Sequence, residues 1–115
     1  KISLLENNDK KCYFLKKVSH EQNLRNTKIS NKTITKKNEL GLFDIITSRA
    51  FATIEKTINL TKTNTHENTK YLLLKGKASN IKKELKDIDK NMFRYEIINQ
   101  DTTKERNIVL LCKDE

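Results

Sequence analysis

LFDIITSRAFA (Leu42–Ala52) is the stretch that decides how this chain is interpreted. Its first half is a short apolar run, which predicts a buried strand, and a helical pattern of apolar residues begins directly after it. Thr47, Ser48 and Arg49 stand at the junction and carry three hydrogen-bonding side chains. Open α/β sheets bind their ligands at the carboxyl ends of their strands. The stretch therefore predicts a ligand-binding junction with a cation at the end of a strand.

The rest of the chain alternates predicted strands with amphipathic helices. Strands are expected at 2–6, 27–30, 43–47, 71–75, 93–98 and 107–112. Helices are expected at 10–22, through Phe51, Ile54 and Ile58, and at 80–90. Asn31–Gly41 is polar and loop-like, and Thr61–Thr69 is rich in residues that disfavour a helix interior. Helices placed between strands predict an α/β domain with a largely parallel sheet, and the polar turn 99–106 predicts a closing antiparallel hairpin.

Length and composition limit the class of protein. The chain has 115 residues, enough for one domain; 35% of them are hydrophobic and 34% are charged. The hydrophobic residues occur in periodic blocks, which favours a folded chain over a disordered one. The formal net charge of +9 favours an anionic partner such as nucleic acid. Because the lysines are spread along the whole chain, an ordinary solvated surface would explain them equally well.

Several classes of site are disfavoured by what the sequence contains. Cys12 and Cys112 each lie in an apolar stretch and predict buried, reduced thiols, while His20 and His66 fit no metal-ligand spacing. No membrane span or signal-peptide pattern is present, so a cytoplasmic location is expected. No Ser/His/Asp set of a hydrolase is recognisable. Transfer of a group from a bound cofactor requires no such set, because the cofactor carries the reactive centre.

The candidate binding residues each have a structural alternative. Glu6 follows the first predicted strand, where a carboxylate commonly accepts hydrogen bonds from ribose hydroxyls, but it could be an ordinary surface acid. The guanidinium of Arg49 can bind a carboxylate or a phosphate, or it could pair with Asp44. Lys75-Gly76-Lys77 is not a P-loop, and it predicts either an RNA contact or two solvated lysines.

Four blocks of the sequence resemble one known family. Phe43–Ala52 is similar to the "FD-hydrophobic-hydrophobic-x-SRAFA" signature of the bacterial ribosomal RNA small subunit methyltransferase G family, also called glucose-inhibited division protein B. Leu4–Leu15 resembles that family's second strand and following helix, and Tyr71–Gly76 resembles its "LKG" strand end. Glu105–Leu110 resembles its closing "ER-x-hydrophobic" strand. The resemblance spans essentially the whole chain.

The resemblance implies a Rossmann-like class I methyltransferase. Such an enzyme transfers a methyl group from S-adenosylmethionine to N7 of a guanine in 16S rRNA, so its partner is that RNA or the precursor of the small ribosomal subunit. By the same resemblance Arg49 and Glu6 are cofactor-binding residues, and Ile34 and Thr35 occupy the positions beside the adenine. Thr35 replaces the family's usual glutamate.

Three further residues are implied to contact RNA or the substrate: Ser48, Lys75 and Arg106. None of the residues singled out is expected to bind a metal.

The family pattern begins with helices, a first strand and a glycine-rich turn that cradles the cofactor. This chain begins at the second strand, and neither Gly41 nor Gly76 stands near that turn. We therefore expect residues 1–115 to be the C-terminal part of a single methyltransferase domain. The missing first strand would leave a gap in the middle of the sheet, and we expect the chain to be inactive without an N-terminal segment.

Two alternatives stay open. A non-catalytic, basic RNA-binding remnant would account for both the charge and the missing glycine turn. Another Rossmann-type nucleotide-binding enzyme would share the role of Glu6, but it would not explain the block Ser48-Arg49-Ala50.

Overall fold

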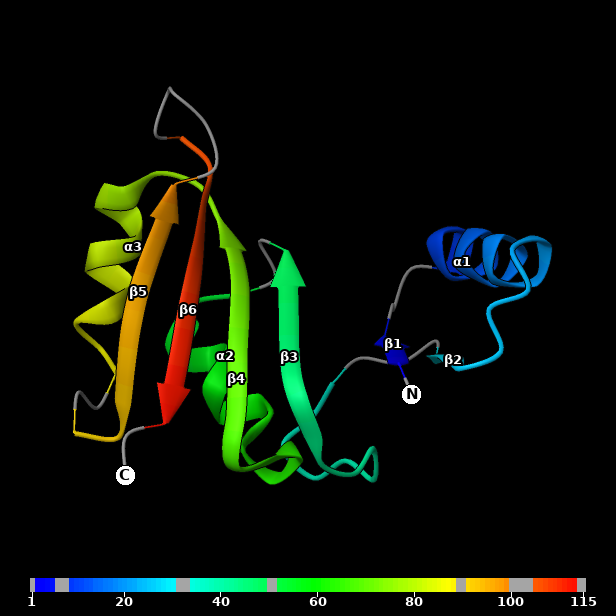
Figure 1. Cartoon of the computed structure of the whole chain (residues 1–115), viewed down its shortest axis with the longest axis horizontal. Helices are drawn as coiled ribbons and strands as arrows, with labels where there is room; N and C mark the ends of the chain where they lie inside the picture. The colour runs from blue at the N-terminus through cyan, green and yellow to red at the C-terminus, as the bar shows by residue number, and fades with distance from the viewer. Residues whose placement is uncertain are drawn as a thin grey trace. The chain divides into compact units, whose positions relative to one another are not determined.

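The computed structural model describes residues 2–5, 9–30, 34–49, 52–88, 91–99 and 105–113 (Figure 1). The chain divides into two compact units, Lys1–Thr35 and Lys36–Glu115, and each unit has its own sheet. Along the chain the strands and helices follow one another in the order that the sequence predicts, with one additional 3₁₀ turn.

The N-terminal unit (Lys1–Thr35) is a β-α-β arrangement. Strand β1 (Ile2–Leu5) and strand β2 (Thr27–Ser30) are parallel, and helix α1 (Asp9–Glu21) connects them. Cys12 is buried on the apolar side of α1, as its position predicts. The helix ends where Asn23 adopts a φ of 54°, a left-handed conformation that asparagine tolerates and that often terminates helices.

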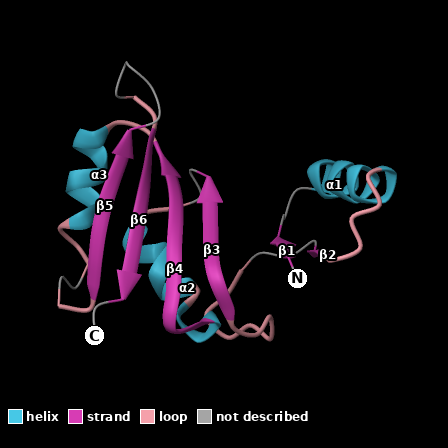
Figure 2. Cartoon of the chain, viewed as in Figure 1, coloured by secondary structure: helices cyan, strands magenta, loops and turns pink. Residues whose placement is uncertain are grey.

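The C-terminal unit (Lys36–Glu115) is built on a four-stranded sheet (Figure 2). Its strands are β3 (Phe43–Arg49), β4 (Thr65–Lys75), β5 (Phe93–Asn99) and β6 (Asn107–Lys113), in the order β3-β4-β6-β5. Strands β3 and β4 are parallel, while β6 runs antiparallel to both of its neighbours. The predicted antiparallel hairpin at the end of the chain is therefore confirmed.

Two helices, α2 (Ile54–Leu60) and α3 (Ala78–Leu85), supply apolar side chains to the core on one face of this sheet. The core consists of alternate residues of the strands packed against these helices: Ile54, Tyr71, Leu73, Ile81, Leu85, Ile88, Phe93, Val109 and Leu111. Each fully buried side chain of this size contributes about 1.5–3 kcal/mol through removal of apolar surface from water. Tyr71 and Phe93 meet edge to face, with ring centroids 6.4 Å apart.

Strand β4 begins earlier than predicted. It starts at Thr65 rather than Tyr71, after the short 3₁₀ helix η1 (Lys62–Asn64). The polar composition of residues 65–70 gives no strand pattern, and this extension of β4 depends on contacts with β3. The buried Thr69 hydroxyl donates to the carbonyl oxygen of Phe43 (2.7 Å) and accepts from the N–H of His66 (2.9 Å). These bonds accompany a shift in the strand register between Phe43 and Ile45.

Two other boundaries differ from the predicted ones. Strand β3 continues to Arg49 instead of ending at Thr47. Its last two residues pair with β4, Ser48 opposite Leu73 and Arg49 opposite Leu74. Helix α3 ends at Leu85, whereas the sequence pattern predicted a helix to residue 90. After Leu85 the chain continues as a tighter turn, in which the N–H groups of Lys86, Asp87 and Ile88 each bond to the carbonyl oxygen three residues earlier.

The described strands form two sheets, β1-β2 in the N-terminal unit and β3-β4-β6-β5 in the C-terminal unit. Among the described strands, β3 pairs with β4 alone, so it forms one edge of the four-stranded sheet. The opposite face of this sheet carries the alternate residues of β4 and β6, including Leu72, Leu74, Ile108 and Leu110, which are half-buried or exposed. No described helix has the length and apolar character needed to cross a membrane.

Candidate functional site at the carboxyl ends of β3 and β4

Arg49 is the last residue of β3, and its side chain is exposed. The alternation along the strand buries Ile46 and Ser48 partly toward the helix-covered face and leaves Thr47 and Arg49 exposed. The predicted cation at the end of a strand is therefore present. Ser48 leaves the strand on the opposite side from Arg49, so the two side chains do not point toward the same group.

Asp44 is not the partner of Arg49. Its Oδ1 atom lies 2.7 Å from Nε2 of His66, on the neighbouring strand. Arg49 lies five positions after Asp44 along the strand, a span of roughly 16 Å. Within the described residues no acid forms an ion pair with Arg49. The guanidinium at the end of β3 is thus available to an external anion.

Lys75, the last residue of β4, is held by neighbouring protein groups. Its side chain is only 9% exposed, and Nζ lies 3.0 Å from Oε1 of Glu84 on α3. The same Nζ donates a hydrogen bond to the carbonyl oxygen of Ala52. The Glu84 oxygen also accepts from the backbone N–H of Ile54 at 3.0 Å. This arrangement favours a structural role for Lys75 over the RNA contact that the sequence suggested.

Glu84 is a functional residue that the sequence pattern did not single out, although a signal was present. Glu84 directly precedes the buried Leu85 and follows the buried Ile81 by three residues. Positions three and four apart share one face of a helix. An acid beside this apolar stripe lies closer to the core than the exposed Lys82 and Lys83. It can therefore pair with a cation inside the fold, which here is Lys75.

Arg106 lies at the same edge of the sheet, immediately before β6. It is exposed, whereas the next residue, Asn107, is 2% exposed and stands opposite Lys75 in the register. The Asn107 amide donates to the carbonyl oxygen of Gly76 at 2.8 Å. The structure thus brings together three residues from distant parts of the sequence, Arg49, Lys75 and Arg106. They lie at the end of the sheet where β3 and β4 finish and β6 begins.

The other predicted cofactor residues belong to the N-terminal unit. Glu6 falls outside the described residues. Ile34 is half-buried and Thr35 is exposed. Both follow the carboxyl end of β2, whose last residue, Ser30, pairs with Leu5 at the end of β1.

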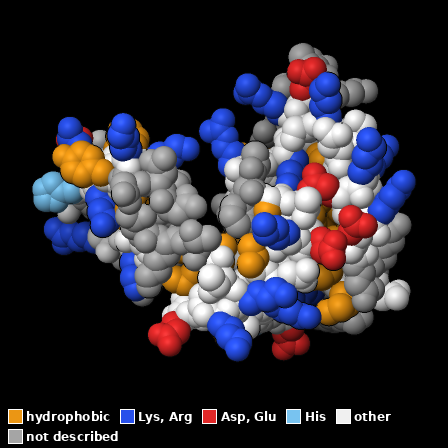
Figure 3. Space-filling model, turned by 180° about the vertical axis from the view of Figure 1, so that it is seen from behind, with side chains coloured by type: hydrophobic (Ala, Val, Ile, Leu, Met, Phe, Trp, Pro, Cys, Tyr) orange, Lys and Arg blue, Asp and Glu red, His pale blue; other side chains and the backbone are white. Residues whose placement is uncertain are grey.

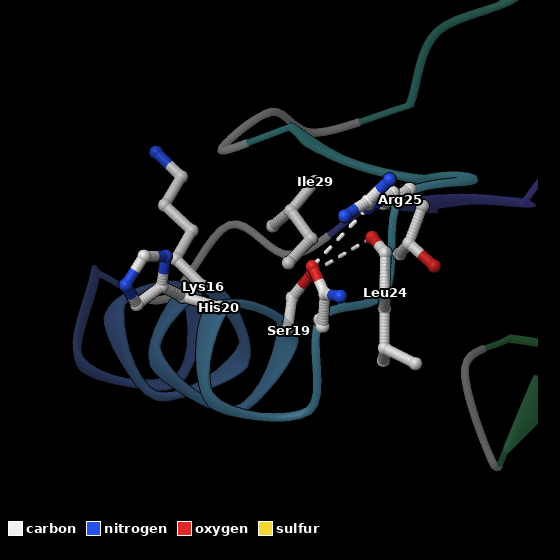
Figure 4. A pocket seen from close by; sticks show the side chains of 8 residues that line it. Lys16, Ser19, His20, Leu24, Arg25 and Ile29 are labelled. Carbon is white, nitrogen blue, oxygen red and sulfur yellow. Dashed lines mark hydrogen bonds between the residues drawn. The ribbon is translucent and has the colours of Figure 1, made fainter.

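The N-terminal unit also contains an open cavity of about 400 Å³ (Figure 4). Lys16, His20 and Arg25 surround it, with Ile29 between them. The cavity adjoins the C-terminal end of α1 and the start of β2, which is the end of β2 away from Ile34. Cations at a helix C-terminus interact favourably with the helix dipole, so this cluster has a structural explanation.

Other basic side chains are distributed over the molecule. In Figure 3, Lys and Arg side chains are scattered over the visible face of each unit, and acidic side chains lie among those of the larger unit. This distribution agrees with a net charge of +9 that is spread along the sequence.

Comparison with known proteins identifies a family. The family model GidB, described as rRNA small subunit methyltransferase G, matches residues 1–109. The protein of that name from Brachyspira hyodysenteriae is 33% identical over 114 residues, covering 96% of this chain and 55% of the relative. The one from Borrelia turicatae is 32% identical over 115 residues, covering 98% of this chain and 55% of the relative. The chain thus spans about half the length of these relatives.

Solved structures show the same fold at low sequence identity. An rRNA methylase from Streptococcus thermophilus superposes with a TM-score of 0.74 at 8% identity, covering 100% of this chain and 74% of that one. A Streptococcus mutans structure in complex with SAH has a TM-score of 0.72 at 10% identity, covering 99% of this chain and 76% of that one. The likeness shows a Rossmann-like, class I methyltransferase fold, as the sequence predicted.

Proposed function

Because this chain belongs to the rRNA small subunit methyltransferase G family, we propose that it contributes the carboxyl-edge part of a site for S-adenosylmethionine. The site would serve methyl transfer to N7 of a guanine in 16S rRNA. The observation that carries the proposal is the exposed guanidinium of Arg49, which ends β3 and is bound by no described acid.

The chemistry of Arg49 suits this ligand. The amino-acid part of S-adenosylmethionine carries a carboxylate, and a guanidinium can bind a carboxylate through two parallel hydrogen bonds. The cofactor supplies the reactive methyl group, so the residues of the chain need only bind and orient it. No nucleophile or Ser/His/Asp set is required for such a transfer.

The remaining cofactor contacts are assigned to the N-terminal unit. A carboxylate after the second strand of a nucleotide-binding sheet suits the ribose hydroxyls, which is the role proposed for Glu6. Ile34 and Thr35 follow the carboxyl end of β2, where the adenine would lie. Thr35 has no carboxylate, so at that position the backbone would have to make the adenine contact.

We also propose that this chain is the C-terminal part of one methyltransferase domain. Strand β3 has an unpaired edge within the described residues, and the curated relatives extend to almost twice this length. A parallel strand placed beside β3 would satisfy its backbone groups. Parallel sheets are covered by helices on both faces, and both described helices of the C-terminal unit supply the core on the face opposite Leu72 and Leu110, so a further layer would fit there.

The proposed RNA contacts lie at the same edge. Arg106 is exposed beside the ends of β3 and β4, and the net charge of +9 favours binding to a polyanion. The charge also supports a second candidate function, that of an RNA-binding protein without catalytic activity. Cofactor binding distinguishes the two candidates.

Equilibrium dialysis with labelled S-adenosylmethionine tests the proposal. The 115-residue chain is measured alone and as a completed protein, in which it follows the N-terminal part of the Brachyspira relative that precedes the aligned region. We expect binding in the completed protein, with a loss of at least tenfold in affinity for Arg49→Ala. Lys70→Ala is the matched control, because Lys70 is also exposed on this sheet but stands opposite Ile45.

Three outcomes decide between the alternatives. Binding that is lost in Arg49→Ala and kept in Lys70→Ala supports the cofactor site. Binding unchanged by Arg49→Ala contradicts the role given to Arg49. Binding of RNA without any binding of S-adenosylmethionine, in either preparation, favours the non-catalytic RNA-binding function.

A further inference from the structure

The connection between β3 and α2 is attached to β4 at both of its ends. On one side, Arg49 pairs with Leu74 in the parallel ladder. On the other side, Lys75 donates through Nζ to the carbonyl oxygen of Ala52. Only two residues, 50 and 51, separate Arg49 from Ala52. Two successive residues of β4 therefore determine where this short connection starts and where it ends.

Glu84 completes the attachment from α3. Its Oε1 atom lies 3.0 Å from Nζ of Lys75 and accepts a hydrogen bond, also at 3.0 Å, from the N–H of Ile54. Ile54 is the first residue of α2, so its N–H has no acceptor within the helix. A carboxylate at this position also interacts favourably with the positive end of the helix dipole.

The burial of the pair argues for a role in geometry. The side chains of Lys75 and Glu84 are only 9% and 21% exposed, whereas the nearby Lys77, Lys82 and Lys83 are exposed. A buried ion pair usually adds little net stability compared with apolar residues of the same volume, because both charges lose their hydration. What the pair provides is a defined set of partners, Ala52 and Ile54, at the start of α2.

We propose that Lys75 and Glu84 are positioning residues, which hold the β3–α2 connection so that Arg49 faces its ligand. They act through the backbone of Ala52 and Ile54 rather than by touching the ligand. The effect on ligand binding rests on the function proposed above, whereas the attachment itself does not.

Hydrogen exchange of the Ile54 amide tests the attachment directly in the complete chain. Glu84→Leu removes the acceptor of this amide, and Glu84→Gln retains an acceptor without the charge. We expect exchange at Ile54 to accelerate at least tenfold in Glu84→Leu, relative to the core amide of Val109, and less than threefold in Glu84→Gln. Unchanged exchange in Glu84→Leu would overturn the proposal.

Binding of S-adenosylhomocysteine, measured by calorimetry on the completed protein described above, tests the effect on Arg49. We expect at least tenfold weaker binding in Lys75→Met, with Lys77→Met within twofold of the parent protein. If Lys75→Met does not fold, Lys75→Met/Glu84→Gln removes both charges and preserves the volume. The double variant is expected to fold and still bind weakly, and parent-like affinity would contradict a positioning role.

The two readouts separate the two proposals. A parent protein that binds no S-adenosylhomocysteine contradicts the proposed function, while exchange at Ile54 still decides whether Glu84 holds the start of α2. Conversely, tight binding together with unchanged exchange in Glu84→Leu contradicts the positioning role alone.

Discussion

Asp44 Oδ1 and His66 Nε2 lie 2.7 Å apart, across the neighbouring strands β3 and β4. The other ring nitrogen of His66, Nδ1, accepts a hydrogen bond from the backbone N–H of Asn68 at 3.1 Å. An accepting Nδ1 carries no proton, so Nε2–H is the donor to the carboxylate. This pairing gives Asp44 a partner near the start of β3, and no acid among the described residues forms an ion pair with Arg49 at its end.

Replacing Asp44 should therefore leave the function of Arg49 intact. The Asp44 side chain is 93% exposed, and exposed pairs contribute less than about 1 kcal/mol, so Asp44→Asn should change the unfolding free energy by no more than that. Urea unfolding and dialysis with S-adenosylmethionine provide the two measurements. A loss of affinity in Asp44→Asn as large as that in Arg49→Ala would show that Asp44 orients the guanidinium after all.

Tyr71 should make stability fall at high pH. Burial raises the pKa of the Tyr71 phenol, and the hydrogen bond to the Thr61 hydroxyl (2.7 Å) partly offsets this increase. Above pH 10 the unfolded chain loses the phenolic proton while the folded chain keeps it, so the contribution of Tyr71 to folding declines as the pH approaches its folded pKa.

The variant Tyr71→Phe isolates this effect. It should be less stable than the parent at neutral pH by about 1 kcal/mol, because the bond to Thr61 is lost. That difference should shrink above pH 10 in urea titrations at increasing pH. Tyr13→Phe serves as the control, since Tyr13 is 71% exposed. A difference that stays constant from neutral pH to pH 11 would be inconsistent with a buried, protonated Tyr71.

Asn107, at the end of the sheet where β3 and β4 finish, should contribute to the free energy of unfolding. Its amide donates to the carbonyl oxygen of Gly76 at 2.8 Å and accepts from Asn99 at 3.3 Å, in a site that is 2% exposed. Asn107→Ala removes both hydrogen bonds and the packing of a buried side chain, and should cost about 1–3 kcal/mol of unfolding free energy. Asn59→Ala, at an exposed position on α2, should change it by less than about 0.5 kcal/mol. Equal effects of the two substitutions would contradict this account.

Arg106 should contribute to RNA binding through charge. Arg106→Gln should weaken binding to a single-stranded rRNA segment and reduce the slope of log K against log salt by about 0.7. Fluorescence anisotropy at several salt concentrations measures both quantities. Lys62→Gln removes another exposed cation, on η1 at the other end of β4, and should leave the slope unchanged. Equal slopes for the two variants would contradict a contact between Arg106 and the RNA.

The order of strands and helices could be predicted because each element carries its own periodicity. The apolar run at Phe43–Thr47 and the spacing of Ile81 and Leu85 identify a buried strand and an amphipathic helix without knowledge of their neighbours. The family signature at Phe43–Ala52 also depends only on local order. The position of Arg49 at the end of a strand follows from the same pattern.

Only the tertiary structure could show which groups meet. Thr65–Thr69 lacks an apolar pattern and becomes part of β4 because the Thr69 hydroxyl bonds to Phe43, a partner 26 residues away. The ion pair of Lys75 with Glu84 likewise depends on α3 packing against the end of β4. Electrostatic and hydrogen-bond partners are determined by distances in the folded chain, whereas periodicity reports only which face of an element is apolar. For this reason the sequence could identify Arg49 as a ligand-binding candidate, but the contacts of Lys75 and Glu84 with Ala52 and Ile54 became visible only in the fold.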